Sequence, residues 1–114
     1  MDDSILISIK KALGIGEDYT PFDCDIIMHI NSTFSILNQL GVGPEIPFSI
    51  SDESKVWSEF IGDEKSIELV KSYMYFKVRL MFDPPSNSSL VEVMNKNIAE
   101  AEWRLNVLVD EGGK

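Results

Sequence analysis

The stretch Tyr-Met-Tyr-Phe-Lys-Val-Arg-Leu-Met-Phe, residues 73–82, decides how this sequence folds. All of its residues are apolar or aromatic except Lys77 and Arg79, and Asp-Pro-Pro follows at 83–85. As a helix the run would be about 15 Å long, half of what a membrane span needs. Protein must therefore cover it. Either it is a central element packed on several sides, or one of its sides is reserved for another subunit.

Taken alone, this run is compatible with a strand or with a helix. Every second residue from Met74 to Phe82 is apolar, which is typical of a strand. The flanking sequence favours a helix, because one helical face continues through Ile67, Val70, Met74, Val78 and Met81. That length far exceeds a usual strand of about 5 to 6 residues. We therefore predict a helix over about 63–82, with an Asp63 N-cap and two prolines beyond its end.

Two helices are predicted before this one from the spacing of their apolar residues. The first is a short amphipathic helix at about 3–13, and Gly14 stops it. The second covers about 21–40. Thr20-Pro21-Phe22-Asp23 resembles a capping box at its start, with the Thr20 side chain accepting from the Asp23 amide, and Gly41 marks its end.

The rest of the chain is predicted to be an irregular loop and a last long helix. Residues 41–54 hold two glycines and two prolines and read as a loop, after which 56–61 can form one or two helical turns. The last helix covers about 89–109 from a capping box at Ser89, and 110–114 are expected to be a flexible tail. Its polar side carries alternating charges at four-residue steps: Glu92, Lys96, Glu100 and Arg104.

The length and composition of the chain indicate a single domain. The chain has 114 residues, 44% of them hydrophobic, so we expect a single all-α domain over 1–114, a compact bundle of three long helices with an ordered core at about 4–109. The formal charge of −9 comes from 19 acids against 10 bases and argues against a nonspecific grip on nucleic acid. The lone Cys24 and the absence of a secretion signal predict an intracellular protein.

Motifs for catalysis or metal binding are absent. There is no phosphate loop, paired-cysteine site or nucleophile elbow, so we predict no enzyme, no cofactor and no metal. Asp25 and His29 could supply only half of a metal site, and we expect His29 to be a boundary residue that hydrogen-bonds Asp25. Cys24 is expected to be a small core residue. Trp57 and Trp103 are also expected in the core, with interface positions as the alternative.

The order of these pieces resembles the head-tail connector (adaptor) proteins of long-tailed bacteriophages and their prophages. The resemblance covers nearly the whole chain, and its most specific part is Lys-Val-Arg-Leu-Met-Phe-Asp-Pro-Pro at 77–85. Further matching segments are Asp25-Ile-Ile-Met-His-Ile-Asn31, Leu40-Gly-Val-Gly-Pro44, Trp57 to Phe60, and Glu102-Trp-Arg-Leu-Asn106.

The resemblance implies a virion structural protein that is made in the host cytoplasm and catalyses no reaction. Such a protein assembles as a homo-oligomeric ring, of about twelve subunits in this family, beneath the portal protein. It extends the DNA channel and docks a downstream neck or tail-completion protein. DNA passes through without specific binding, which suits an acidic chain, and no membrane is involved.

Within this interpretation some charged and aromatic residues become candidates for contacts. The bases either reach acids of a neighbouring subunit or lay their stems over apolar surface with their heads in water. Candidate subunit-interface residues are Lys71, Lys77, Arg79, Trp57 and Trp103. Candidates for an acidic surface or channel lining are Asp52, Glu53, Glu59, Asp63 and Glu64.

Two other functions remain open at this point. An acidic helical regulator or inhibitor could bind a basic host or phage protein, and it would need its acids on one continuous surface. A small metal protein or enzyme would use Asp25 and His29, and it would lose its metal signal or activity when His29 is replaced.

Overall fold

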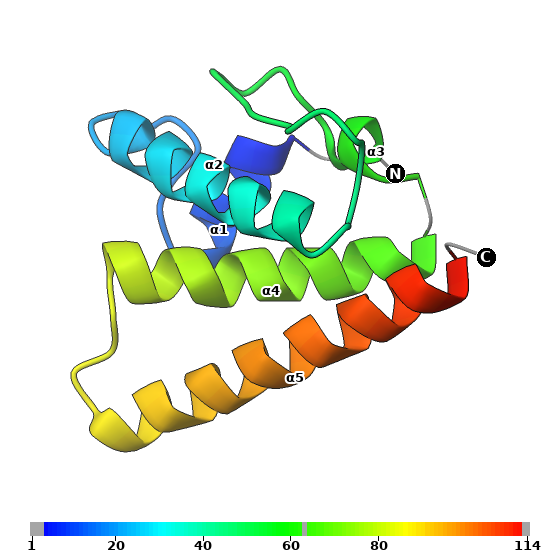
Figure 1. Ribbon diagram of the computed structural model, residues 1–114. Helices are drawn as coiled ribbons and strands as arrows, with labels where there is room; N and C mark the ends of the chain where they lie inside the picture. Colours follow the sequence, from blue (N-terminus) through cyan, green and yellow to red (C-terminus); the bar gives the residue numbers. More distant parts are fainter. Residues whose placement is uncertain (1–3, 63, 113–114) are drawn as a thin grey trace.

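The computed structural model describes residues 4–62 and 64–112, and within them the protein is built of helices alone (Figure 1). The described residues contain one isolated bridge, between Ser4 and Val56, and no strand. The elements are α1 (Ile5–Ala12), α2 (Asp23–Gln39), α3 (Trp57–Phe60), α4 (Glu64–Phe82) and α5 (Ser88–Gly112). The predicted all-α bundle of three long helices is thus confirmed.

Helix α4 is the central element of the bundle. It lies between α5 on one side and the pair α1 and α2 on the other, so its neighbours cover it from opposite directions (Figure 1). Val70, Tyr73, Met74 and Val78 are completely buried. Neighbouring helices therefore cover much of the wide apolar surface of the 73–82 run. Met81 remains 41% exposed.

The start of α2 differs from the prediction by two residues. The helix begins at Asp23 with Phe22 as its N-cap, and no side chain caps it. The Asp23 amide donates to the backbone carbonyl of Thr20 at 3.0 Å, so the predicted role of the Thr20 side chain is wrong. Thr20 to Phe22 form a turn, because the chain must bend there to bring Asp23 over α1.

Helix α5 is longer than predicted at both ends. Its start is capped by the side chain of Asn87, whose Oδ1 accepts from the amides of Ser89 at 2.8 Å and Leu90 at 3.3 Å. The predicted Ser89 capping box is therefore wrong. At the other end Val109 still packs against the core, so the helix continues to Gly112. The last two residues of the predicted tail, and the predicted Asp63 cap, lie outside the described residues.

A buried lysine ties α1 to the start of α2. Lys10 is completely buried; its Nζ lies 2.8 Å from Oδ1 of Asp23 and donates to the carbonyl of Glu17 at 3.1 Å. These contacts hold the connection between the two helices close to α1. Breaking such a pair from one side typically costs about 3–5 kcal/mol, because a charge is left buried without its partner. The spacing of apolar residues that predicts α1 does not show that Lys10 is buried.

Two asparagines of α2 hold the long loop that follows it. Asn31 bonds Ile50 twice: its Nδ2 donates to the Ile50 carbonyl at 2.9 Å, and its Oδ1 accepts from the Ile50 amide at 2.8 Å. Seven residues on, Nδ2 of Asn38 lies 3.3 Å from the carbonyls of Pro44 and Glu45. Because residues i and i+7 share a helix face, the loop follows one side of α2.

The loop closes over a cluster of aromatic rings. Phe34 of α2 packs against Phe48 and Phe60 with ring centroids 5.0 and 4.6 Å apart, and Trp57 lies 6.5 Å from Phe34. The Trp57 indole N–H donates to Oγ of Ser8 at 2.8 Å, which links α3 to α1. These contacts make the irregular loop and the short α3 part of the core.

We expect Asn31→Ala to lower the free energy of unfolding by about 2 kcal/mol, since each lost hydrogen bond is worth about 0.5–1.5 kcal/mol. Urea denaturation followed by circular dichroism measures the change. Ser32→Ala, on the neighbouring exposed position, serves as control and should shift the value by about 0.5 kcal/mol or less. Equal stabilities of the two variants would contradict the role given to Asn31.

We expect Gly43→Ala to destabilise the protein more than Gly14→Ala. Both glycines have positive φ, +88° and +82°, and an alanine there costs about 1–2 kcal/mol of backbone strain. A Cβ on Gly43 would also lie 2.5 Å from the Phe60 ring, whereas a Cβ on Gly14 meets nothing within 4 Å. Displacing the ring adds about 1–3 kcal/mol. Thermal and urea unfolding of both variants test this order, and equal losses would refute the clash.

Candidate partner-binding surfaces

The three candidate bases on α4 have different surroundings. Lys71 lies 3.7 Å from Glu68 and its Nζ is 5.9 Å above the Trp57 ring. Arg79 is held at the end of α4: its Nε donates to the Asp83 carbonyl at 2.5 Å, and its guanidinium donates to the Tyr75 hydroxyl at 3.2 Å. Lys77 is half-buried, and within the described residues no ion pair to it is found. Of the three, Lys77 is the base left for a partner.

The two tryptophans have opposite environments. Trp57 is 2% exposed in the core, as expected, and its indole cannot reach a neighbouring subunit from there. Trp103 is 68% exposed, so the core interpretation is wrong for it. The reason is its place on α5, where Ala101 and Leu105 take the buried side and leave residue 103 outside.

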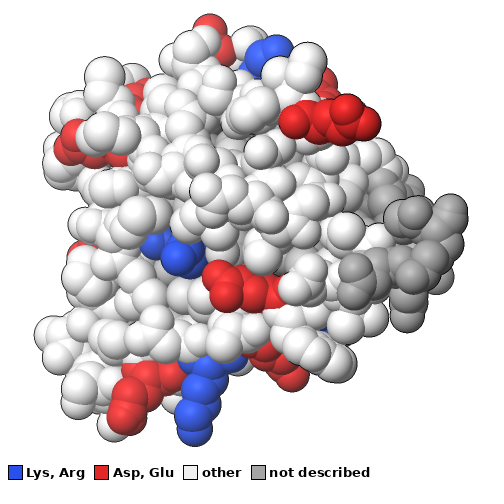
Figure 2. All heavy atoms as spheres, viewed as in Figure 1, with Lys and Arg blue, Asp and Glu red and all other residues white. Residues whose placement is uncertain are grey.

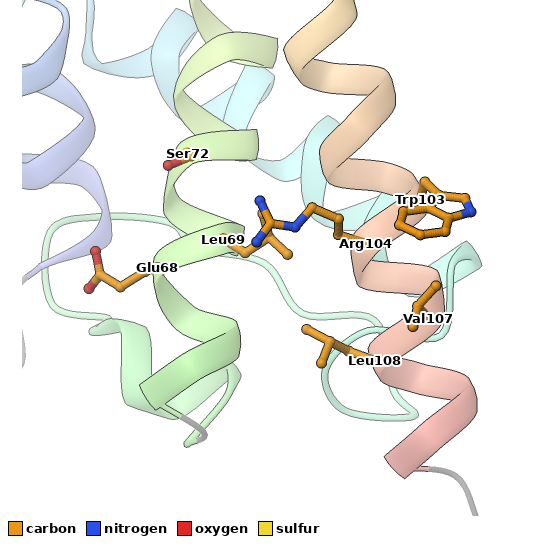
Figure 3. A pocket seen from close by; sticks show the side chains of 7 residues that line it. All are labelled: Glu68, Leu69, Ser72, Trp103, Arg104, Val107 and Leu108. Atoms are coloured by element: carbon orange, nitrogen blue, oxygen red, sulfur yellow. The ribbon is translucent and has the colours of Figure 1, made fainter.

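A groove lies between α4 and α5 beside Trp103. It encloses about 540 Å³, and Figure 3 shows Arg104 and Leu108 of α5 pointing toward α4 while Trp103 points away from it. The lining residues are Glu68, Leu69 and Ser72 of α4 with Trp103, Arg104, Val107 and Leu108 of α5. Its walls combine apolar side chains with one acid and one base. Such a groove suits a protein segment.

A second apolar surface lies at the C-terminal end of α4, which we call the aromatic end. The Phe22 ring lies 5.6 Å from Tyr19 and 5.3 Å from Phe82, and the His29 ring packs edge-on to Phe82 at 6.5 Å. Tyr19 and Phe22 are 51% and 41% exposed. The sequence did not predict this cluster, because its rings come from the α1–α2 connection, α2 and α4. The aromatic end is therefore a candidate binding surface.

The candidate acids are partly used within the chain. Asp52 accepts from the amide and the hydroxyl of Ser54 at 2.8 and 2.6 Å, and these bonds, with Lys55 nearby, lower the pKa of its carboxyl. Glu59 pairs with Lys55 at 3.5 Å and bonds the Val56 amide. Glu53 is exposed, whereas Asp63 and the side chain of Glu64 lie outside the described residues.

Acidic side chains do not gather on the face shown in Figure 2. They stand in separate groups, several near its rim and one near its middle, with uncharged atoms between them. A regulator that imitates nucleic acid would need a continuous acidic surface, and this face does not provide one.

Cys24, Asp25 and His29, the residues that could have contributed to a metal site, do not form one in the structure. Cys24 is exposed, so its prediction as a core residue is wrong: at the start of α2 its side chain faces away from the bundle. His29 is half-buried as expected, but it packs against Phe82, and no hydrogen bond joins it to Asp25, both residues being described. Among the described residues no group of three possible metal ligands occurs.

One buried polar contact joins the two longest helices. The hydroxyl of Tyr73, inside α4, donates to Oε2 of Glu102 on α5 at 2.7 Å. Burial raises the pKa of Tyr73, and the hydrogen bond to the Glu102 carboxylate and its negative charge raise it further. The contact therefore keeps the phenol protonated and sets the register of α5 along α4.

The described residues thus present an exposed groove between α4 and α5 and an exposed cluster of rings at the aromatic end. A family model for phage connector protein matches residues 5–112, nearly the whole chain. The chain belongs to this phage connector protein family. No curated protein and no solved structure matched in the corresponding searches.

Membership confirms the resemblance found in the sequence. The family is structural, and a connector interacts with components of the phage head and tail in the virion. In this connector no helix of the described residues is long and apolar enough to cross a membrane. Its exposed groove and aromatic end are therefore candidates for contacts with other virion proteins.

We expect the stability of this connector to fall above about pH 10, the ordinary pKa of tyrosine. The folded state holds the Tyr73 proton more tightly than the unfolded state, so this stabilisation is complete below that pH and is lost as the pH rises. Tyr73→Phe should lose about 1–3 kcal/mol at pH 8 and show a shallower decline from pH 9 to 11. Urea unfolding at each pH measures both, with the exposed Tyr19→Phe as control; parallel declines would contradict the assignment.

Proposed function

We propose that this protein is a head-tail connector that assembles as a ring beneath the portal, extends the DNA channel and docks the next neck or tail component. Family membership over residues 5–112 carries this proposal. The proposal goes beyond family membership in four respects: the ring, its number of subunits, the portal contact and the downstream partner.

The two apolar surfaces support assembly into a ring. The groove is lined by Glu68, Leu69 and Ser72 in the N-terminal half of α4, whereas Phe82 of the aromatic end is the last residue of that helix. At 1.5 Å per residue, Leu69 and Phe82 are about 20 Å apart along the axis. A ring needs two different surfaces on each protomer, since its contacts are heterologous. Separate surfaces at two levels of α4 meet that need.

The charge of the protein is compatible with a channel for DNA. Acids exceed bases by nine, so phosphates would meet few cations to hold them, and DNA could slide without being retained. Asp52, Glu53 and Glu59 are the described members of the proposed acidic lining, and Lys55 neutralises part of that group. In this proposal the acids keep DNA moving and the apolar surfaces hold the proteins together.

Lys77 and Arg79 are proposed to contribute to the subunit contact. Lys77 is the better position for a test, because Arg79 also bonds Tyr75 and Asp83 within its own chain. Trp103 belongs to the groove side of the protomer. Lys71 lies over the ring of Trp57, which acts from the core through the packing of α3.

We expect Lys77→Glu to impair incorporation into portal-containing particles at least tenfold while changing the free energy of unfolding by less than about 1 kcal/mol. The physical reason is that an acid at this position repels the acidic partner side chains that Lys77 would meet. Quantitative protein staining of purified particles measures incorporation. Lys11→Glu, an exposed lysine on α1, makes the same charge change and is the control.

If the Lys77→Glu variant were incorporated normally, Lys77 would not take part in the subunit contact. Failure of the wild-type protein to join portal-containing particles at all, together with absence from purified virions, would refute the connector proposal itself.

A further inference from the structure

The outer face of α5 carries a row of exposed charges. Glu92, Lys96, Glu100 and Arg104 follow one another at four-residue steps, and Arg104, the last of them, lies at the edge of this face and also lines the groove beside α4. Along the α5 edge in Figure 2, basic atoms stand between two groups of acidic atoms. Such a four-residue row is a ridge of the kind that interdigitates in the commonest class of helix crossing, at about −50°.

These four side chains form no ion pair within the described residues. Elsewhere in the protein the same kind of spacing does give pairs, as between Lys55 and Glu59 at 3.5 Å. An alternating row usually stabilises its own helix by such pairs. Here the charges are free to meet another molecule.

The row is complementary in charge to the same row of a second copy of α5 that runs antiparallel, with the two residues 98 at the same level. Position 92 then faces 104, an acid against a base, and position 96 faces 100, a base against an acid. The same alignment brings Val93, 52% exposed, opposite Trp103, 68% exposed. One alignment therefore pairs all four charges and covers the largest exposed ring of α5.

Neighbouring alignments do not have this property. A parallel pairing sets each charge beside its own copy. Moving the antiparallel centre to residue 96 brings Glu92 against Glu100, and moving it to residue 100 brings Lys96 against Arg104. Like charges in direct opposition are repulsive and select against those arrangements.

We propose that the outer face of α5 binds a second copy of this chain in an antiparallel, two-fold dimer centred on residue 98. The contact is isologous and closes on itself, whereas the contact that builds a ring is heterologous. It is therefore a separate property of the free protein, and it shields Trp103 from water. A single helix pair covers less than the roughly 1,200–2,000 Å² of a standard stable interface, so the dimer is weak and concentration-dependent.

Two single charge reversals and their mixture test the dimer. Lys96→Glu places acids at both 96 and 100, and Glu100→Lys places bases at both, so each variant alone repels its own copy. In a mixture of the two, each acid of one chain faces a base of the other. Sedimentation equilibrium of the full chain, from micromolar to millimolar concentration, should show a wild-type dimer, a dissociation constant raised at least about tenfold for each variant, and recovery in the mixture.

Two further variants separate this contact from changes in folding. Trp103→Ala should weaken the dimer by about 30-fold, as expected for a central aromatic residue. Lys11→Glu makes the same charge change as Lys96→Glu far from α5 in sequence and should leave the dimer intact. Circular dichroism checks that helix content is unchanged in each.

A wild-type protein that stays monomeric at millimolar concentration would overturn the proposal. So would a mixture that associates no better than its components, because the rescue depends on 96 facing 100 across the contact. Either result leaves the connector proposal standing, since that is tested by incorporation into particles.

Discussion

Covering the apolar sides of α4 is the constraint on which the rest of the structure depends. Val70, Met74 and Val78 share one face of α4 and are fully buried, and Tyr73, at the side of that face, is also fully buried and bonds Glu102 of α5. The chain meets this need by placing α5 on one side and α1 with α2 on the other. Burial of each such side chain is worth about 1.5–3 kcal/mol, so losing any covering helix would expose a large part of the core.

Polar contacts then decide where the covering elements sit. The buried Lys10 and Asp23 hold the first connection, Asn31 holds the loop at Ile50, and Tyr73 with Glu102 sets α5 against α4. Apolar packing alone tolerates sliding, whereas a buried hydrogen-bonding group must meet its partner or lose free energy. These few contacts give the bundle one arrangement and leave the groove and the aromatic end exposed in defined places.

For a connector, exposed apolar surface beside a rigid core is a functional arrangement. Trp103 stands on α5, and His29 and Phe82 of the aromatic end stand on α2 and α4, helices whose opposite sides lie in the core. Partners therefore meet surfaces that are already formed, which reduces the entropy lost on binding. The excess of acids over bases favours the solubility of a protein with such surfaces, and it is compatible with the proposed channel for DNA.

The sequence by itself determined the helices, because the spacing of apolar residues is a local property that any covering partner must respect. It predicted a helix through the 73–82 run, the core position of Trp57 and the family, but it left open whether other helices or another subunit would cover that run. It could not distinguish Trp103 from Trp57, nor show that Lys10 is buried and Asn31 is a loop anchor. Those roles depend on which distant residue lies opposite, and the same is true of Phe22 meeting Phe82. Only tertiary packing decided them, because a side chain's environment is set by the elements that close around it.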